Sequence, residues 1–93
     1  MDFDWDKANV EHIALHDVSP KEAEQAVVLN SIDLDYQVVE GEDRFRILGM
    51  TAQGRLLCVV ITPRYDKIRI VTAYPATPSQ RRIYFRLAGF PNG

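Results

Sequence analysis

The sequence predicts an α+β fold with two N-terminal helices, a small antiparallel sheet in the form of a meander, and a C-terminal helix. Two capping boxes, S-P-K-E at residues 19–22 and T-P-S-Q at residues 77–80, each mark a helix start. Between them, strand-like segments are separated by turns of a few residues, which suit antiparallel neighbours. We expect the helices to pack on one face of the sheet, and residues 1–93 to form a single domain.

The helices follow from their caps and from apolar spacing. Asp6 is a suitable N-cap for a helix over residues 7–16. Its apolar side chains recur at helical spacing, at Val10, Ile13 and Ala14. The first capping box opens a second helix from Pro20 to about Leu29, and the other opens a last helix that ends near residue 87.

The strands are predicted from alternation and from the turns that bound them. They cover residues 35–40, 44–51, 55–62 and 67–73. The third is apolar on both faces, as expected of a central strand. Phe3 and Trp5 suggest an additional N-terminal strand.

Alternation also divides the strand residues between two faces of the sheet. In the second predicted strand, Arg44 and Arg46 lie opposite to Phe45 and Ile47. In the last strand, one face carries Lys67, Arg69 and Val71, and the other carries Ile68, Ile70 and Thr72. We therefore expect Thr72 to face the core, and the cations to face away from it.

Charge is distributed unevenly along the chain. Residues 1–39 carry nine acidic and two basic side chains, a net charge of −7, whereas residues 40–93 carry four acidic and nine basic ones, a net charge of +5. Such asymmetry is typical of a surface that binds a polyanion. Mutual neutralisation of the two halves on one surface explains it equally well.

Other features point to a cytoplasmic setting without a membrane. The longest aliphatic run, L-L-C-V-V-I at residues 56–61, is too short to span a bilayer. The acidic start M-D-F-D-W-D does not resemble a secretory signal. The single cysteine, Cys58, excludes an intrachain disulfide and is expected to be a buried, reduced thiol.

We expect neither a metal nor another cofactor. His12 and His16 are four residues apart, which can place two imidazoles on one helix face. No cysteine lies near them and no H-E-x-x-H motif is present, so two partly exposed histidines on an amphipathic helix are favoured over a zinc site. The sequence also has no G-x-S-x-G motif and no glycine loop of the kind that binds phosphate.

The remaining candidate for chemistry is a group of cations with tyrosines between them. The cations on the strands are Arg44, Arg46, Lys67 and Arg69, and those on the last helix are Arg81, Arg82 and Arg86. The tyrosines are Tyr36, Tyr65, Tyr74 and Tyr84. Arginine binds phosphate through two parallel hydrogen bonds, and tyrosine stacks on unpaired bases, so the group suggests single-stranded RNA. Arginines that are merely solvated are the alternative.

Taken in order, several short segments resemble the BrnT toxins, ribonucleases of type II toxin–antitoxin systems with a RelE-like fold. The segments are W-D at residues 5–6; His16, Val18-Ser19 and Glu22-Ala23; G-E-D-R-F at 41–45; I-L-G-M-T at 47–51; G-R-L-L-C-V-V at 54–60; D-K-I-R-I-V-T-A at 66–73; A-T at 76–77; and R-R-I-Y at 81–84. The resemblance covers nearly the whole chain, and its specificity comes from the order of the segments.

The resemblance implies metal-free RNA cleavage, in which the 2′-hydroxyl attacks its own phosphate. Arg44, Arg69 and Arg81 would then bind phosphate, while Glu42, His16, Lys67 and Tyr84 are unranked candidates for proton transfer. Arg46, Lys67, Tyr74 and Arg82 would hold RNA. A further implied partner is a BrnA-type antitoxin, a ribbon-helix-helix protein that binds DNA. The alternatives are a weak ion pair between Glu42 and Arg44, and a packing role for Tyr84.

This chain also departs from the pattern that it resembles. The toxins usually have S-A-R where this chain has Thr72-Ala73-Tyr74, a glutamate where it has Gln80, and H-G-V where it has His16-Asp17-Val18. A neutral amide at position 80 supports a capping box but cannot act as a general base. A degenerate member that docks an antitoxin or RNA without cleavage is therefore the alternative function, followed by a structural subunit without RNA contact.

Overall fold

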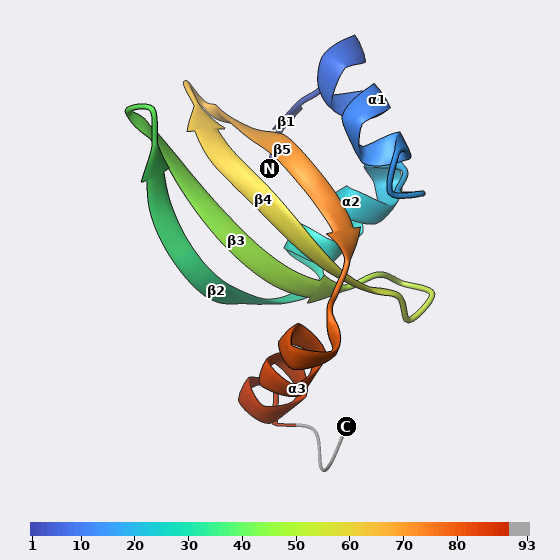
Figure 1. Ribbon diagram of the computed structural model, residues 1–93. Helices are drawn as coiled ribbons and strands as arrows, with labels where there is room; N and C mark the ends of the chain where they lie inside the picture. Colours follow the sequence, from blue (N-terminus) through green and yellow to red (C-terminus); the bar gives the residue numbers. More distant parts are fainter. Residues whose placement is uncertain (90–93) are drawn as a thin grey trace.

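The computed structural model describes residues 1–89, which form three helices and one five-stranded sheet (Figure 1). The helices are α1 (Lys7–Ala14), α2 (Pro20–Val28) and α3 (Pro78–Leu87). The strands are β1 (Phe3–Asp4), β2 (Asn30–Val39), β3 (Glu42–Met50), β4 (Leu56–Arg64) and β5 (Lys67–Pro75). The predicted α+β class is confirmed.

The sheet has the strand order β1-β5-β4-β3-β2. Strands β2 to β5 form the predicted antiparallel meander, and the short β1 adds a parallel pair, Phe3 beside Ile68, at its edge. Strand β2 begins at Asn30, earlier than predicted, because the chain enters the sheet directly after α2 and pairs Asn30 with Met50. The Ser31 hydroxyl stabilises this transition by donating to the Val27 carbonyl at 2.9 Å.

All three helices begin at capping boxes. The predicted pairs Ser19 with Glu22 and Thr77 with Gln80 are formed, and Asp6 makes a third one with Asn9. Helix α1 ends at Ala14, two residues before the predicted end. In the described part of the chain, no helix is long and apolar enough to cross a membrane.

The helices cover both faces of the sheet, so the expectation that they pack on one face is wrong. Leu57 and Val59 of β4 join the core beneath α1 and α2, whereas the alternate residues Leu56 and Cys58 join a second cluster that includes Tyr84 of α3. The cause is the strand end at Pro75, after which the chain is held back to the sheet by the Ala76 amide and carries α3 over the opposite face. Figure 1 shows α3 at one end of the sheet, away from α1 and α2.

Helix α2 approaches β3 very closely at Gly49. A Cβ atom built there would lie 1.7 Å from the carbonyl oxygen of Ala26 in α2. Only glycine leaves room for this contact, which brings the buried Ala23 and Ala26 onto the sheet.

A bulge in β5 overturns the expected orientation of Thr72. Ile70 pairs with Ile61, but Thr72 already pairs with Val60, so Val71 is the extra residue. Beyond the bulge, Ala73 instead of Thr72 joins Ile70 in the core under α1 and α2. The predicted faces are therefore correct up to Val71, which lines the same face as Arg69, and wrong for Thr72. The bulge also turns Tyr74 into the cluster on the α3 side.

Candidate functional site

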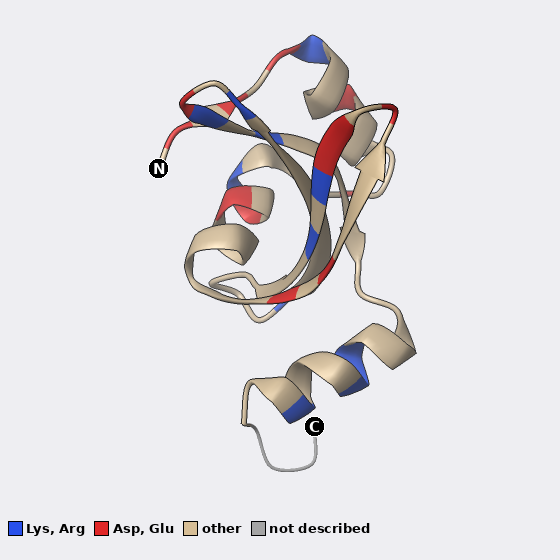
Figure 2. Ribbon diagram, turned by 90° about the vertical axis from the view of Figure 1, so that its left-hand side faces the viewer, with Lys and Arg blue, Asp and Glu red and all other residues tan. Residues whose placement is uncertain are grey.

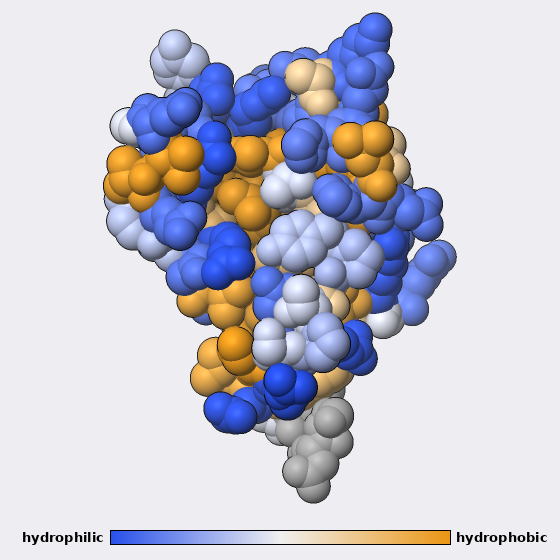
Figure 3. Space-filling model, viewed as in Figure 1, coloured by the Kyte–Doolittle hydropathy of each residue, from blue (hydrophilic) through white to orange (hydrophobic). Residues whose placement is uncertain are grey.

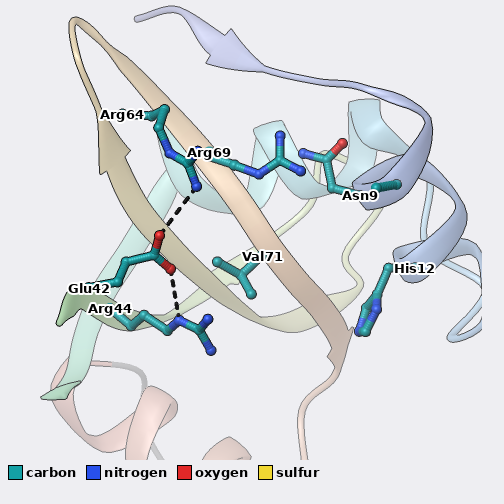
Figure 4. Close-up of a pocket in the computed structure, with 8 residues that line it drawn as sticks. Asn9, His12, Glu42, Arg44, Arg64, Arg69 and Val71 are labelled. Atoms are coloured by element: carbon teal, nitrogen blue, oxygen red, sulfur yellow. Dashed lines mark hydrogen bonds and ion pairs between the residues drawn. The ribbon is translucent and has the colours of Figure 1, made fainter. Parts of the chain in front are cut away.

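The face of the sheet opposite to α2 contains an open pocket of about 320 Å³ near the β4–β5 turn (Figure 4). Its lining comes from one helix and three strands: Ala8, Asn9 and His12 of α1, Glu42 and Arg44 of β3, Arg64 of β4, and Arg69 and Val71 of β5. Three arginines, one carboxylate and one imidazole therefore share a single hollow.

Helix α1 is fixed beside this pocket by Asn9, which is 3% exposed. Its Nδ2 atom donates to the carbonyl oxygens of Asp4 at 2.9 Å and Ile70 at 3.1 Å, while its Oδ1 atom accepts from the Asp6 amide. Asn9 thus ties the first turn of the helix to the neighbouring strands β1 and β5. His12, three residues further along the helix, is held at the pocket by this anchor.

Glu42 bridges two cations of the pocket. Its Oε1 atom accepts from Arg44 Nε at 3.1 Å, and its Oε2 atom accepts from Arg64 Nη2 at 3.2 Å. Figure 4 shows both contacts on one side of the pocket, with His12 on the other side. The side chains of Glu42 and Arg44 are each 32% exposed, and that of Arg64 is 44% exposed. Because the ions are partly hydrated, these pairs are weak enough for a phosphate to displace.

Arg69 is held more firmly. Its Nη1 atom lies 3.0 Å from Asp6 Oδ2 and 3.6 Å from Asp4 Oδ2, and the side chain is only 17% exposed. The hydrogen bond from Arg69 lowers the pKa of the Asp6 carboxyl, and the same bond raises the pKa of Arg69. Every arginine of the pocket is therefore paired with a carboxylate.

Beside this pocket, Arg46 and Tyr74 lie on the same face. Arg46 is directly opposite Asp35 and binds it through two hydrogen bonds, one of them from Nε to Oδ1 at 2.8 Å. This pairing lowers the pKa of Asp35 and raises that of Arg46. The ring of Tyr74 meets the His16 ring at 6.1 Å between centroids.

Two of the positions that depart from the toxin pattern, Tyr74 and Gln80, are in contact with each other. Gln80 is 7% exposed, and its Oε1 atom accepts from the Thr77 amide at 2.9 Å, as the capping box requires. Its Nε2 atom donates to the Tyr74 hydroxyl at 3.4 Å. Gln80 therefore connects the N-terminus of α3 to the end of β5.

Helix α3 carries its cations on a separate surface. Arg81 and Arg82 line a smaller hollow with Pro78 and Phe85, and the Arg81 guanidinium lies 5.5 Å from the centre of the Phe85 ring. Figure 2 shows α3 with basic residues and no acidic ones, in contrast to the mixed charges of the strands.

Tyr84 is 1% exposed, and its hydroxyl donates to the Asn30 carbonyl at 2.7 Å. Burial raises its pKa. The sequence allowed either a catalytic role or a packing role for Tyr84. These contacts are those of a side chain that packs in the core.

The structure thus brings together only part of the predicted site. Glu42, Arg44 and Arg69 line the pocket, whereas Lys67 and His16 do not, and the three candidates on α3 lie elsewhere. Sequence reasoning considered His12 only as a metal ligand and did not assign Arg64. Alternation along β4 places Arg64 on the same face of the sheet as Leu56 and Cys58. This alternation is the sequence feature from which Arg64 could have been assigned to the site. Within residues 1–89, no three His, Cys, Asp or Glu side chains gather as a metal site would require.

An α+β fold whose sheet carries an arginine-rich pocket beside a carboxylate and an imidazole suits a protein that binds a phosphodiester. Residues 5–80 match the family described as ribonuclease toxin, BrnT, of type II toxin–antitoxin system, and the chain belongs to this family. Membership implies an antitoxin as partner and RNA as substrate. No curated protein matches the sequence.

Proposed function

We propose that this protein is a metal-independent endoribonuclease toxin whose active site is the pocket around Glu42. The observation that carries the proposal is the single carboxylate that bridges Arg44 and Arg64 beside Arg69 and His12. Glu42 in this position resembles a bound phosphate, since both groups present two oxygens to two guanidinium groups.

The first step is phosphate binding. A phosphodiester that enters the pocket competes with Glu42 for Arg44 and Arg64, because both cations point toward the same carboxylate (Figure 4). Arg69 supplies a third positive charge that Asp4 and Asp6 keep in place. Fixed cations of this kind stabilise the charge that develops on the phosphorus oxygens in the transition state.

The second step is proton transfer. Displaced from the arginines, the Glu42 carboxylate accepts the proton of the 2′-hydroxyl, whose oxygen then attacks the adjacent phosphorus. The bond from phosphorus to the 5′-oxygen breaks, and a protonated His12 donates a proton to that oxygen. The products are a 2′,3′-cyclic phosphate and a 5′-hydroxyl. Glu42 and His12 fit these two roles because they line opposite sides of the pocket (Figure 4).

The proposal is tested with purified protein and RNA in the presence of a chelator, together with growth after induced expression. We expect cleavage to persist with the chelator, and products with cyclic phosphate ends. Arg44→Ala should reduce cleavage strongly, whereas Arg86→Ala, which removes an exposed arginine of α3, should leave it unchanged. Normal growth together with intact RNA would refute the proposal.

Other properties of the protein extend the same proposal. They are a RelE-like architecture, one domain over residues 1–93, a cytoplasmic location, and a ribbon-helix-helix antitoxin of the BrnA type. An adjacent reading frame for such an antitoxin, and co-purification of its product with this chain, would test the partner.

The contact between Tyr74 and Gln80 favours a second candidate function, a binding module without catalysis. In that case the native protein binds RNA or the antitoxin and leaves RNA intact, and the double variant Tyr74→Arg with Gln80→Glu gains cleavage. Cleavage by the native protein would exclude this candidate.

A further inference from the structure

A row of three aromatic rings leads from the pocket toward α3. His12, which lines the pocket, lies with its ring centre 6.2 Å from that of His16, and the His16 ring lies 6.1 Å from that of Tyr74. The rings are tilted by 56° and 62°, so they do not cover one another by stacking. In such tilted and edge-to-face contacts one ring presents its edge to the other, so the row covers at most one face of a ring at each contact.

The three rings are held by different parts of the fold. Tyr74 packs at the edge of the cluster around Leu48 and Cys58, and its hydroxyl accepts from Gln80. His16 follows α1 in a turn that is closed by hydrogen bonds from its amide and the next one to the carbonyls of Ile13 and Ala14. The anchored Tyr74 is half-buried, while both imidazoles are exposed. The row thus consists of one tyrosine that is held in place by its contacts and two imidazoles that solvent can reach.

Hydrophilic side chains cover much of this side of the molecule, with hydrophobic ones between them (Figure 3). Cations on this face are already paired, since Arg46 binds Asp35 and Arg69 binds Asp6. Aromatic rings, in contrast, offer a nucleic acid an interaction that needs no displaced partner. Stacking also accepts any base, because every base has a flat face.

We propose that His16 and Tyr74 form a subsite for an unpaired base of single-stranded RNA, next to the phosphate that is bound in the pocket. This inference rests on the proposed function, because the pocket determines where the phosphate lies. The His12 ring marks the junction between the two, since it belongs to both the pocket and the row. Base-paired RNA does not fit this arrangement, because its bases are already stacked within the duplex.

The test measures binding of a short single-stranded oligoribonucleotide with 2′-O-methyl sugars, which block cleavage, and of a matched strand that lacks bases. Stacking of one base should make wild-type protein bind the strand with bases about 5- to 160-fold more tightly. Tyr74→Ala and the exposed His16→Ala should each reduce that preference, whereas Tyr74→Phe, which keeps the ring, should retain it. Circular dichroism checks folding, and His16→Ala tests the row even if Tyr74→Ala unfolds.

The outcomes separate this inference from the proposed function. If wild-type protein binds and cleaves RNA but does not distinguish the two strands, or if His16→Ala and Tyr74→Phe behave alike, the subsite is refuted and the pocket stands. If wild-type protein neither binds the strands nor cleaves RNA, both proposals fail. A preference that depends on the Tyr74 ring and on His16 supports the subsite.

Discussion

Replacement of Glu42 by glutamine is expected to change binding and cleavage in opposite directions. The carboxylate pairs with Arg44 and Arg64, and all three side chains are about one-third exposed or more. Pairs with this exposure are each worth about 0.2–1 kcal/mol. A phosphate that no longer displaces them gains about 0.4–2 kcal/mol, so the variant should bind an uncleavable RNA strand about 2- to 30-fold more tightly.

Cleavage by the same variant should fall, because a neutral amide cannot accept the proton of the 2′-hydroxyl. A positioned general base contributes about 10²- to 10⁴-fold, and we expect a loss of that order in single-turnover cleavage of RNA. Glu40→Gln is the matched control, since Glu40 is exposed and has the same charge at the turn before β3. Weaker binding by Glu42→Gln would show that Glu42 does not compete with phosphate, and unchanged cleavage would show that it is not the base.

Three further predictions concern stability, measured by chemical or thermal unfolding. Gly49→Ala should lower the unfolding free energy by about 1–3 kcal/mol, because its Cβ meets Ala26; an unchanged midpoint would contradict the close approach. Tyr84→Phe should lower the unfolding free energy by about 1 kcal/mol, and the melting temperature by about 4–8 °C, because the hydrogen bond to Asn30 is lost. RNA cleavage by this variant should be unchanged, whereas a loss of cleavage would indicate a catalytic role for Tyr84. The backbone hydrogen bond from Ser19 lowers the pKa of Glu22, and Arg46 lowers that of Asp35. Carboxyl groups with lowered pKa values stabilise the folded state at a pH above their pKa in the unfolded chain, about 4. The unfolding free energy should therefore fall as the pH drops below about 4. The fall should be smaller in the Asp35→Asn variant, which lacks one of these carboxyl groups.

Local chemistry made much of the fold predictable. Capping boxes depend on residues three apart, so they could be read from the sequence, and each one starts a helix in the structure. The short turns between consecutive strands likewise predicted an antiparallel meander, because strands joined by so few residues pair side by side in opposite directions. What the sequence did not reveal was the side of the sheet on which α3 packs, because that depends on the path of the chain after Pro75 and on the fit of Tyr84.

The candidate site was predictable only in part for a similar reason. Alternation identified Arg44 and Arg69 as members of one face, and the structure places both in the pocket. His12 was missed because its role depends on the anchor of Asn9 to Ile70, a contact between residues far apart in the sequence. The bulge at Val71 could not be predicted either. Val71 is an ordinary apolar strand residue, and nothing in the sequence indicates that β4 has no residue opposite to it.

The contact between Tyr74 and Gln80 changes how the two departures from the toxin pattern should be interpreted. Taken separately, each is the loss of a charged group that the toxins usually have at that position. In the structure they form one hydrogen-bonded unit, and Gln80 still completes its capping box. A glutamate at position 80 alone would place a charge in a nearly buried position, and an arginine at position 74 alone would lie close to Arg46. The paired change therefore preserves the support of α3, and it leaves the arginines and carboxylate of the Glu42 pocket untouched.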